Sequence, residues 1–381
     1  MKVSIVTQGL GVKSGGPSRS ILALSQGLRA SGVELHIHTS NSEDNPNLIE
    51  DDWIKCVNVK SSGLFGYVSG FKKMLSSTDA QLYHIQGLFS YIPMIAPWLI
   101  RKLGKPYIVA PRGMLYANAL KKSSKKKKIF RRIFIDRDLN KAAAIHVTCI
   151  EEMREVRNAG IISPIAIIPN SINVPSELPT LAKADKFRVV FVGRINVIKN
   201  IDGLMRAWAL AGFGNRKDSE LLIVGGTNLD TEVSYQDYLY KLEKDLGVSN
   251  IVWAGMKNGK EKEDLLQTCS IAVLPSHSEN FGMVIPEALI NGIPCIASDK
   301  TPWKMLEDNH CGWSTPNDPE SMARILKLAS KLTPKEHECM GRNGQRMVVE
   351  NFSTNIVTKK IIELYDWVLG NSDKPSFVYV R

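Results

Sequence analysis

Two glutamates stand eight positions apart in the stretch PSHSENFGMVIPEAL, residues 275–289. Glu279 precedes a Phe-Gly pair that can open a helix, and Glu287 falls about one turn into that helix. Carboxylates accept hydrogen bonds from hydroxyl groups, which suits sugar and ribose rings. The partial positive charge of a helix N-terminus would explain one glutamate, but it does not explain the pair.

Two cations lie in FVGRINVIKN, residues 191–200, just past the end of an expected strand. Arg194 and Lys199 could neutralise a pyrophosphate and stabilise its charge as it leaves. A solvated surface pair is the alternative interpretation. Taken with Glu279 and Glu287, the cations favour a nucleotide-sugar site, with phosphates on cations and backbone amides and hydroxyls on carboxylates.

Glycines precede another expected helix in TQGLGVKSGGPSRSILALSQGLRASG, residues 7–32. Backbone amides at Gly15 and Gly16 could approach an anion closely. A flexible connection is the simpler interpretation. Neither a P-loop pattern nor a properly spaced G-x-G-x-x-G fingerprint is present.

The elements that must position these residues are short apolar runs alternating with helical patterns. The runs are continuously apolar, as in parallel strands that helices cover on both faces. Strands are expected at 2–7, 34–39, 81–86, 107–111, 144–149, 165–169, 188–193, 221–226, 251–255, 271–276 and 294–298. Residues 173–186, with two prolines, are expected to form a linker. The pattern predicts an α/β protein with two doubly wound, Rossmann-like domains facing a central cleft, whose ligands lie beyond the carboxyl ends of the strands.

Composition is that of a soluble globular protein, with 44% hydrophobic and 23% charged residues in a chain of 381, enough for two domains. The longest apolar run, residues 91–100, is far shorter than the ~20 residues of a membrane span. The opening MKVSIVTQ is expected to be a strand, so no secretory signal is predicted. Six cysteines without paired spacing indicate a reducing cytoplasm and neither a zinc site nor disulfides.

Positive charge is concentrated in the first half. Residues 1–180 hold 24 Lys and Arg and 13 Asp and Glu, whereas residues 181–381 hold 25 of each sign. Eight cations lie between positions 121 and 132, beside apolar residues at helical spacing. This pattern predicts binding to an anionic membrane surface, through Lys125, Lys126, Lys127, Lys128, Arg131 and Arg132. A solvated charge run is the alternative, and nucleic acid is disfavoured because no aromatic stacking platform accompanies the block.

These motifs together resemble the retaining glycosyltransferases of family 4, with the GT-B fold and an E-x7-E pair formed by Glu279 and Glu287. Further matches are GGP at 15–17, YHIQGLFS at 83–90, PRGML at 111–115, IPNSI at 168–172, TPW at 301–303 and CGW at 311–313. The resemblance covers nearly the whole chain. It is closest in kind to bacterial enzymes of surface-polysaccharide and lipopolysaccharide synthesis.

The resemblance implies transfer of a hexosyl group from a nucleoside-diphospho-sugar to a lipid-linked or cell-surface glycan, without a cofactor or metal. It implies an acceptor domain over 1–175 and a donor domain over 187–360, with a helix over about 360–381 packing back on the first. It also implies a cytoplasmic protein, peripheral on the inner face of the membrane.

The family's roles carry over onto matching positions. Arg194 and Lys199 hold the diphosphate, Glu287 the ribose and Glu279 the donor sugar. Remaining donor contacts come from backbone amides of Gly15, Gly16, Phe281, Gly282 and Met283.

The acceptor side departs from the family pattern at two positions. Many members carry a histidine, bordering the reacting sugar, where this chain has Arg112. Because arginine stays charged and cannot act as a base, Arg112 would act electrostatically or bind an acidic acceptor. Gln86 replaces the second histidine of a common HxHG, which leaves His84 either on the acceptor side or as a plain strand-end histidine.

Retention without a protein base implies that the departing diphosphate accepts the acceptor's proton, while the protein supplies positioning and charge stabilisation. Glu279 as a covalent nucleophile is the second mechanism. Two other functions remain open, a nucleotide-sugar epimerase of the same fold and a non-catalytic sugar- or membrane-binding module. The sequence leaves the donor, acceptor, linkage and oligomeric state undetermined.

Overall fold

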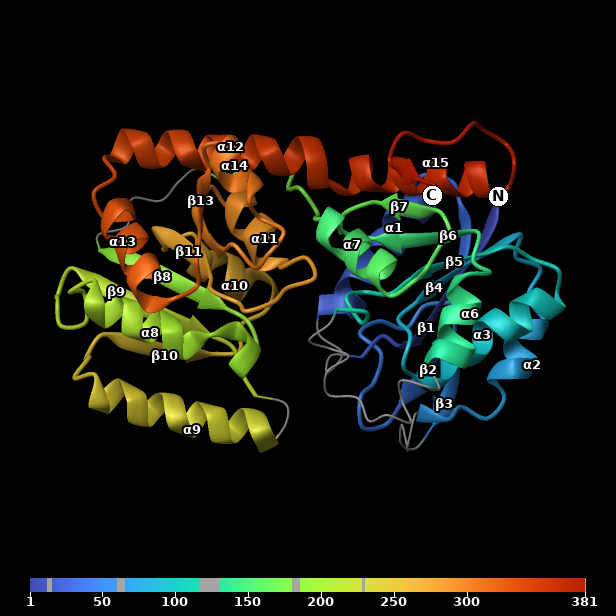
Figure 1. Ribbon diagram of the computed structural model, residues 1–381, viewed down its shortest axis with the longest axis horizontal. Coiled ribbons are helices and arrows are strands. Elements are labelled where there is room, and N and C mark those ends of the chain that lie inside the picture. The colour runs from blue at the N-terminus through green and yellow to red at the C-terminus, as the bar shows by residue number, and fades with distance from the viewer. Residues whose placement is uncertain (12–15, 60–65, 117–130, 180–185, 228–229, 381) are drawn as a thin grey trace. The chain divides into compact units, whose positions relative to one another are not determined.

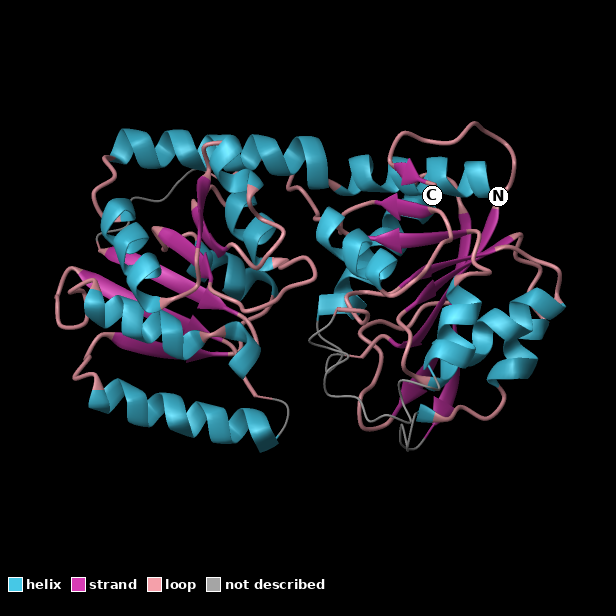
Figure 2. Ribbon diagram, viewed as in Figure 1, coloured by secondary structure: helices cyan, strands magenta, loops and turns pink. Residues whose placement is uncertain are grey.

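The computed structural model describes residues 1–11, 16–59, 66–116, 131–179, 186–227 and 230–380 (Figure 1). Contacts divide the chain into two compact units. Unit 1 contains Met1–Asn173 and Thr354–Arg381, and unit 2 contains Val174–Ser353. Each unit is built around one sheet, with helices on both faces (Figure 2).

Unit 1 has an eight-stranded sheet in the order β14-β7-β6-β5-β4-β1-β2-β3. All neighbouring strands are parallel except β14 and β7. The strands are β1 (Lys2–Gly9), β2 (Glu34–Ser42), β3 (Ile54–Val59), β4 (Leu82–Gln86), β5 (Tyr107–Ala110), β6 (Ala144–Val147), β7 (Ile165–Ile167) and β14 (Val378–Tyr379).

Helices of unit 1 bury two apolar cores, one on each face of its sheet. One core lies under α2 (Phe71–Ser76), α3 (Tyr91–Lys102), α6 (Asp136–Leu139) and α7 (Ile150–Asn158). The other lies under α1 (Gly16–Ala30) and α15 (Thr354–Val368), and it contains Ile21, Leu24 and Leu28 beside Ile361 and Leu364. Residues that follow unit 2 in the chain thus complete the core of unit 1.

Unit 2 has a six-stranded parallel sheet in the order β10-β9-β8-β11-β12-β13. The strands are β8 (Phe187–Val192), β9 (Ser219–Val224), β10 (Ile251–Gly255), β11 (Ile271–Leu274), β12 (Cys295–Ser298) and β13 (Gly312–Thr315). Its helices are α8 (Ile201–Leu210), α9 (Asp230–Asp245), α10 (Gly259–Leu266), α11 (Val284–Ile290), α12 (Met305–Asp308), α13 (Pro319–Ala329) and α14 (Pro334–Phe352).

The predicted fold class is confirmed, since both units are doubly wound parallel sheets covered by helices. Every expected strand is present. Three strands were missed, β3, β13 and β14, and all three are the last strands at an edge of their sheet. Their sequences lack the continuous apolar run that identified the central strands and the edge strand β10.

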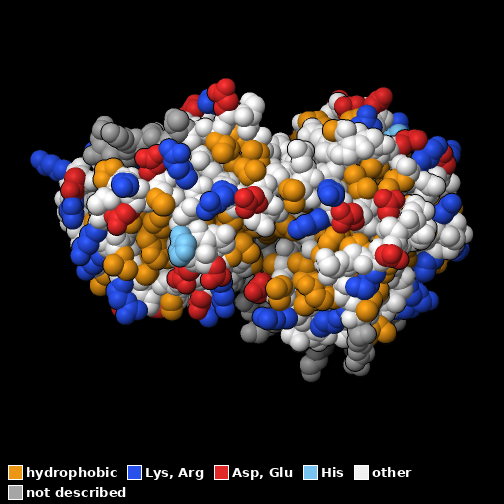
Figure 3. Space-filling view, turned by 90° about the horizontal axis from the view of Figure 1, so that it is seen from above, with side chains coloured by type: hydrophobic (Ala, Val, Ile, Leu, Met, Phe, Trp, Pro, Cys, Tyr) orange, Lys and Arg blue, Asp and Glu red, His pale blue; other side chains and the backbone are white. Residues whose placement is uncertain are grey.

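Charged side chains of both signs lie interspersed on the face of the molecule shown in Figure 3. In the part of the chain that the structure describes, no helix is both long and apolar enough to cross a membrane.

Candidate functional site

The strand order of unit 2 reverses between β8 and β11, which pair as neighbours. Ligands of doubly wound sheets bind beyond the carboxyl ends of the strands at such a reversal. The segments that follow these two strands carry Arg194, Lys199 and Glu279. The candidate donor-side residues therefore belong to the part of the sheet where a ligand is expected.

The segment after β8 turns closely against the segment after β9. A Cβ atom on Gly225 would lie 1.8 Å from the carbonyl oxygen of Gly193, so this approach requires glycine. The Ile195 amide donates to the Gly226 carbonyl oxygen at 3.1 Å. These contacts fix the backbone on both sides of Arg194.

Asn200 joins this segment to the one after β11. Its backbone is left-handed, with φ 55° and ψ 41°, and its side-chain amide donates to the Pro275 carbonyl oxygen at 3.1 Å. The His277 amide donates to the Ile198 carbonyl oxygen at 2.8 Å. Because Lys199 lies between the two bonded residues, its backbone is held against the loop after β11.

Lys199 and Glu279 form an ion pair, with 2.5 Å between Nζ and Oε2. The Ser276 hydroxyl donates to the same carboxylate oxygen at 3.3 Å. The two side chains are 20% and 17% exposed, so both remain partly accessible to solvent. Lys199, expected to hold the diphosphate, thus lies in direct contact with Glu279, expected to hold the donor sugar.

Arg194 contacts a buried carboxylate that the sequence analysis missed. Its Nη1 atom lies 3.4 Å from Oε1 of Glu232 on α9, and Asn196 Nδ2 donates to the same oxygen at 3.0 Å. Glu232 is 1% exposed, whereas Arg194 is 56% exposed. The buried carboxylate therefore orients a guanidinium that remains open to solvent.

Aromatic packing fixes the loop that follows Glu279. The rings of Phe281, Trp303 and Phe352 lie with centroids 5.2–5.7 Å apart, and the Trp303 indole donates to the Phe281 carbonyl oxygen. Gly282 has φ 80°, and a Cβ atom there would lie 2.6 Å from Leu274. The tryptophan of the TPW motif thus shapes the loop that carries the first glutamate.

The helix predicted to begin at residues 282–285 is α11, with Met283 as its N-cap. Glu287 lies in its first turn. Its Oε1 atom is 2.8 Å from Nζ of Lys262 on α10, a partner that the sequence analysis also missed. Glu279 and Glu287 are therefore each paired with a lysine from another element.

In unit 1, Gly15 lies outside the described residues, and Gly16 is the first residue of α1. A Cβ atom on Gly16 would meet no atom within 4 Å. The described part of this turn therefore shows no close approach that would require glycine.

His84 is completely buried within β4. Its Nδ1 atom is 2.8 Å from the Tyr365 hydroxyl on α15, and its Nε2 atom is 3.2 Å from Nδ1 of His146. Burial, together with the neighbouring His146 and Arg112, lowers the pKa of His84 well below its usual value. Burial likewise lowers the pKa of His146 to about 3. The expectation that His84 lines an acceptor site is wrong, because both ring nitrogens are engaged inside the core.

Arg112 follows β5 and hydrogen-bonds to two side-chain amides. Its Nε atom donates to Gln86 Oε1 at 2.8 Å, and its Nη1 atom donates to Asn170 Oδ1 at 2.5 Å. Gln86 ends β4, and Asn170 follows β7. Arg112 therefore lies at the carboxyl edge of the sheet in unit 1, at the same kind of edge as the residues of unit 2.

The lysine block, including Lys125, Lys126, Lys127 and Lys128, lies outside the described residues. The predicted amphipathic helix appears from residue 131 as a π-helical turn, Arg131–Ile135, that leads into α6. Arg131 forms an ion pair with Asp136 at 3.4 Å and is 22% exposed. The side chain of Arg132 is also outside what the structure describes.

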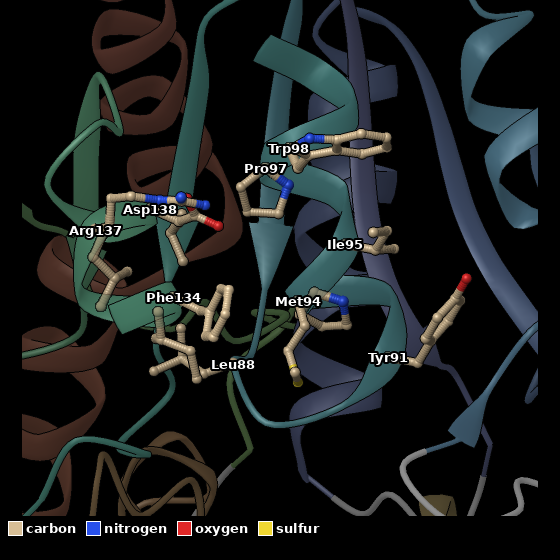
Figure 4. Close-up of a pocket in the computed structure, with 13 residues that line it drawn as sticks. Leu88, Tyr91, Met94, Ile95, Pro97, Trp98, Phe134, Arg137 and Asp138 are labelled. Atoms are coloured by element: carbon tan, nitrogen blue, oxygen red, sulfur yellow. The ribbon is translucent and has the colours of Figure 1, made fainter. Parts of the chain in front are cut away.

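An apolar pocket of about 510 Å³ lies between α3 and the segment from Phe134 to Leu139. Figure 4 shows Met94 and Trp98 on the α3 side and Phe134 and Arg137 on the other. Lys102 holds its ammonium 3.9 Å from the centre of the Trp98 ring. The pocket lining is thus mainly apolar, and it includes the cation Arg137 and the carboxylate Asp138.

Comparison with known proteins identifies the family. Residues 178–347 match the family described as glycosyl transferases group 1, and residues 15–171 match the glycosyl transferase 4-like domain. The chain belongs to the group 1, family 4-like glycosyltransferases. The first match overlaps the expected donor domain, and the second match overlaps the expected acceptor domain.

Individual relatives of this glycosyltransferase are distant. An uncharacterized glycosyltransferase of Methanocaldococcus jannaschii is 28% identical over 185 residues, which are 48% of this chain and 45% of that one. The matched segment therefore spans less than half of that relative's length.

Solved structures share the whole fold at lower identity. Sucrose-phosphate synthase from Thermosynechococcus elongatus has a TM-score of 0.79 at 18% identity, covering 98% of this chain and 100% of that chain. Anabaena HepE, solved in complex with UDP-glucose, has a TM-score of 0.73 at 15% identity, covering 96% and 100%. These similarities establish the GT-B fold.

Proposed function

We propose that this glycosyltransferase moves a hexosyl group, with retention of configuration, from a nucleoside-diphospho-sugar to a lipid-linked or cell-surface glycan. The observation that carries the proposal is the grouping of Arg194, Lys199 and Glu279 after β8 and β11, at the reversal of strand order in unit 2. HepE, which shares the fold, was solved with UDP-glucose. That complex supports a nucleotide sugar as the donor.

The donor diphosphate would bind to the two cations. Arg194 presents a half-exposed guanidinium held from behind by Glu232, and Lys199 presents an ammonium beside Glu279. Charge-assisted hydrogen bonds from both would stabilise the negative charge that develops on the leaving diphosphate. In this scheme the two cations supply the charge that a metal ion supplies elsewhere, so no metal is required.

Glu279 and Glu287 would accept hydrogen bonds from the hydroxyls of the donor sugar and of the ribose. Each carboxylate has one oxygen near a lysine, which leaves acceptor positions on the other oxygen. The bond between the anomeric carbon and the diphosphate would break while the acceptor oxygen bonds to that carbon on the same face, which preserves the configuration. The leaving diphosphate would take the proton of the acceptor hydroxyl. The protein's part is then positioning and charge stabilisation.

Unit 1 would bind the acceptor at an anionic membrane surface on the cytoplasmic side. The lysine block would supply the positive charge. The pocket beside α3 would supply an apolar surface, and residues 134–139, which follow the block in the sequence, form part of its lining. Lysine and arginine near a bilayer attract anionic lipids, and exposed aromatic side chains suit its interface. Phe134 at the pocket is 45% exposed.

A panel of nucleotide sugars tests the enzymatic proposal. A donor at 100 times its Kd stabilises the folded protein by about 2.7 kcal/mol, so thermal unfolding with UDP-, GDP- and ADP-sugars identifies it. Transfer is then measured with a membrane extract as acceptor, with and without a chelator. We expect one nucleotide series to stabilise the protein and transfer to survive the chelator. Isomerisation of the donor without any acceptor would instead identify an epimerase.

A further inference from the structure

The carboxyl edge of the unit 1 sheet brings together polar side chains from four neighbouring strands. Arg112 follows β5, Gln86 ends β4, Glu152 lies in the helix after β6, and Asn170 follows β7. Side chains at this edge of a doubly wound sheet are placed to meet a ligand. The cluster is therefore in a binding position, and its chemistry defines what it can bind.

The guanidinium of Arg112 is held by amides alone. Gln86 and Asn170 accept its hydrogen bonds at 2.8 and 2.5 Å. Among the residues that the structure describes, no carboxylate lies within ion-pair distance of it. A partly buried cation without an ionic partner is unfavourable by itself, and an incoming anion would relieve this.

The negative charge of Glu152 acts on Arg112, but the oxygens of Glu152 are hydrogen-bonded elsewhere. Oε1 accepts from the Gly113 amide at 2.6 Å, and Oε2 accepts from the Thr148 amide and hydroxyl at 2.8 and 2.9 Å. The carboxylate thus shapes the loop that carries Arg112. Nη2 of the guanidinium has no hydrogen-bond partner among the described residues.

Two further donors at this edge are buried without a partner. Nε2 of Gln86 makes no hydrogen bond in the structure, although the residue is 3% exposed. The hydroxyl of Ser171, next to Asn170, is likewise buried without a partner. Buried polar atoms are nearly always satisfied in folded proteins, so orphaned donors beside a cation indicate a missing acceptor.

The backbone at Arg112 is also held in an uncommon conformation. Its φ of 55° is left-handed, which is unfavourable for a residue with a side chain. Residues held in such conformations cluster at active sites and ligand-binding sites. Beside Arg112, the buried His84 and His146 are hydrogen-bonded to each other, His84 also to the Tyr365 hydroxyl and His146 also to the Ile168 carbonyl oxygen.

We propose that Arg112, with the amide of Gln86, binds an oxyanion on a sugar substrate, namely a carboxylate or a phosphate ester. Both oxyanions present more than one oxygen, so one oxygen can accept a charge-assisted hydrogen bond from Arg112 while another accepts from Nε2 of Gln86. The proposal rests on the proposed sugar-transfer function and narrows its substrate to an acidic sugar. The acidic group belongs either to the donor sugar or to the acceptor, and these two sources are separated by the test.

The test compares ligand pairs that differ only in this group. UDP-glucuronate and UDP-glucose form the donor pair, and glucose 6-phosphate and glucose form the acceptor pair. Calorimetry on the full chain measures the four dissociation constants. We expect the anionic member of one pair to bind about ten- to a hundredfold more tightly, as one charge-assisted contact provides.

Gln86→Glu is the decisive variant. It places an isosteric carboxylate 2.8 Å from Nε of Arg112, so the cation gains an internal partner without loss of volume. The preference for the anionic ligand should disappear while thermal unfolding shows a folded protein. Arg112→Gln should have the same effect, and Arg216→Gln, at an exposed arginine paired with Asp218, is the matched control that keeps the preference.

Three outcomes separate the proposals. A preference within the donor pair places the acid on the donor sugar, and a preference within the acceptor pair places it on the acceptor. Equal affinities within both pairs, or a preference that survives Gln86→Glu, would overturn the anion site. If no nucleotide sugar binds while glucose 6-phosphate still depends on Arg112, the proposed transfer function fails and the anion site stands.

Discussion

At the residue scale, the contact between Lys199 and Glu279 has a direct consequence for ligand binding. At 2.5 Å, the ammonium is already attracted to a carboxylate when a diphosphate approaches. The two anions share one cation, and the partial burial of the pair strengthens both attractions compared with bulk water. Removing the carboxylate should therefore affect phosphate binding and sugar transfer in opposite directions.

Glu279→Ala should leave a folded protein whose transfer rate falls by about 10²- to 10³-fold, the size expected when one transition-state contact is lost. Affinity for free nucleoside diphosphate should stay the same or rise, because Lys199 no longer faces a competing carboxylate. Calorimetry and initial rates measure the two effects. Glu261→Ala, at an exposed glutamate, is the control. Activity within twofold of the parent would remove Glu279 from the site.

Arg194→Ala and Lys199→Ala should weaken binding of nucleoside diphosphate far more than binding of the free nucleoside. Loss of a charge-assisted phosphate contact costs about 1.5–3 kcal/mol. Titration calorimetry with both ligands measures the difference, and Lys260→Ala, at a lysine that is 77% exposed, is the control. Equal losses for nucleoside and nucleoside diphosphate would contradict the assignment to phosphate.

Local spacing predicted which residues follow β8 and β11, but it did not predict their partners. Glu232 and Lys262 come from α9 and α10, which lie between the two strands in the chain and pack against neighbouring segments. Sequence periodicity identifies the buried face of a helix, yet it does not fix which residue of that helix meets a given loop. The ion pairs of Arg194 and Glu287 could therefore only be found in three dimensions.

At the element scale, burial explains which strands the sequence predicted and which it missed. The central strands were predictable because helices cover both faces and every position is apolar. β13 (Gly312–Thr315) has only four residues, and in β3 (Ile54–Val59) only Ile54 is fully buried. An edge strand of this kind has no sequence signal that separates it from a loop.

The sequence of the lysine block predicts binding to an anionic membrane surface, and this binding should depend on the positive charge of the block. Changing Lys125, Lys126, Lys127 and Lys128 to Ser should leave most of the protein in solution when it is sedimented with anionic vesicles. Each basic residue near such a surface contributes about 1 kcal/mol before salt screening. Wild-type binding should rise with the fraction of anionic lipid and fall with added salt.

The matched control for this experiment changes four exposed lysines of unit 2 to Ser, namely Lys217, Lys260, Lys331 and Lys335. It removes the same net charge from the half of the chain whose charges balance. If both variants bind vesicles as the wild type does, the block is a solvated surface. If both lose binding equally, total charge and not the block is responsible.

At the scale of the whole molecule, the chain returns to unit 1 after completing unit 2. Val357, Ile361 and Leu364 of α15 lie in the core that also contains α1. Tyr365 reaches the buried histidine pair, with its hydroxyl 2.8 Å from His84. The stability of unit 1 therefore depends on contacts between segments from both ends of the sequence, and on histidines that are held neutral.

Three buried histidines of unit 1 make its stability depend on pH. Burial lowers the pKa of His38 to about 4 and of His146 to about 3, and it lowers the pKa of His84 well below the usual value. In the unfolded chain each histidine takes up a proton near pH 6.5. As the pH falls below 6.5, the unfolded state therefore binds protons that the folded state does not, and the free energy of unfolding decreases.

The decrease should reach about 1.4 kcal/mol per pH unit for each such histidine. Burial raises the pKa of Glu152, which acts in the opposite direction because the folded state then binds a proton more readily. Comparing variants at one histidine cancels this contribution. In His146→Gln, the slope of the unfolding free energy against pH between 5 and 6.5 should be shallower by the contribution of one proton, about 1.4 kcal/mol per pH unit.

Urea unfolding at several pH values measures these slopes, and His36→Gln on β2 is the matched control. Glutamine can still donate toward the Ile168 carbonyl oxygen, which His146 contacts at 2.8 Å, so the variant should fold at pH 7.5. A slope equal to that of the wild type would mean that His146 takes up its proton in the folded protein. The histidine pair beside Arg112 would then carry a positive charge, and that charge would repel the guanidinium.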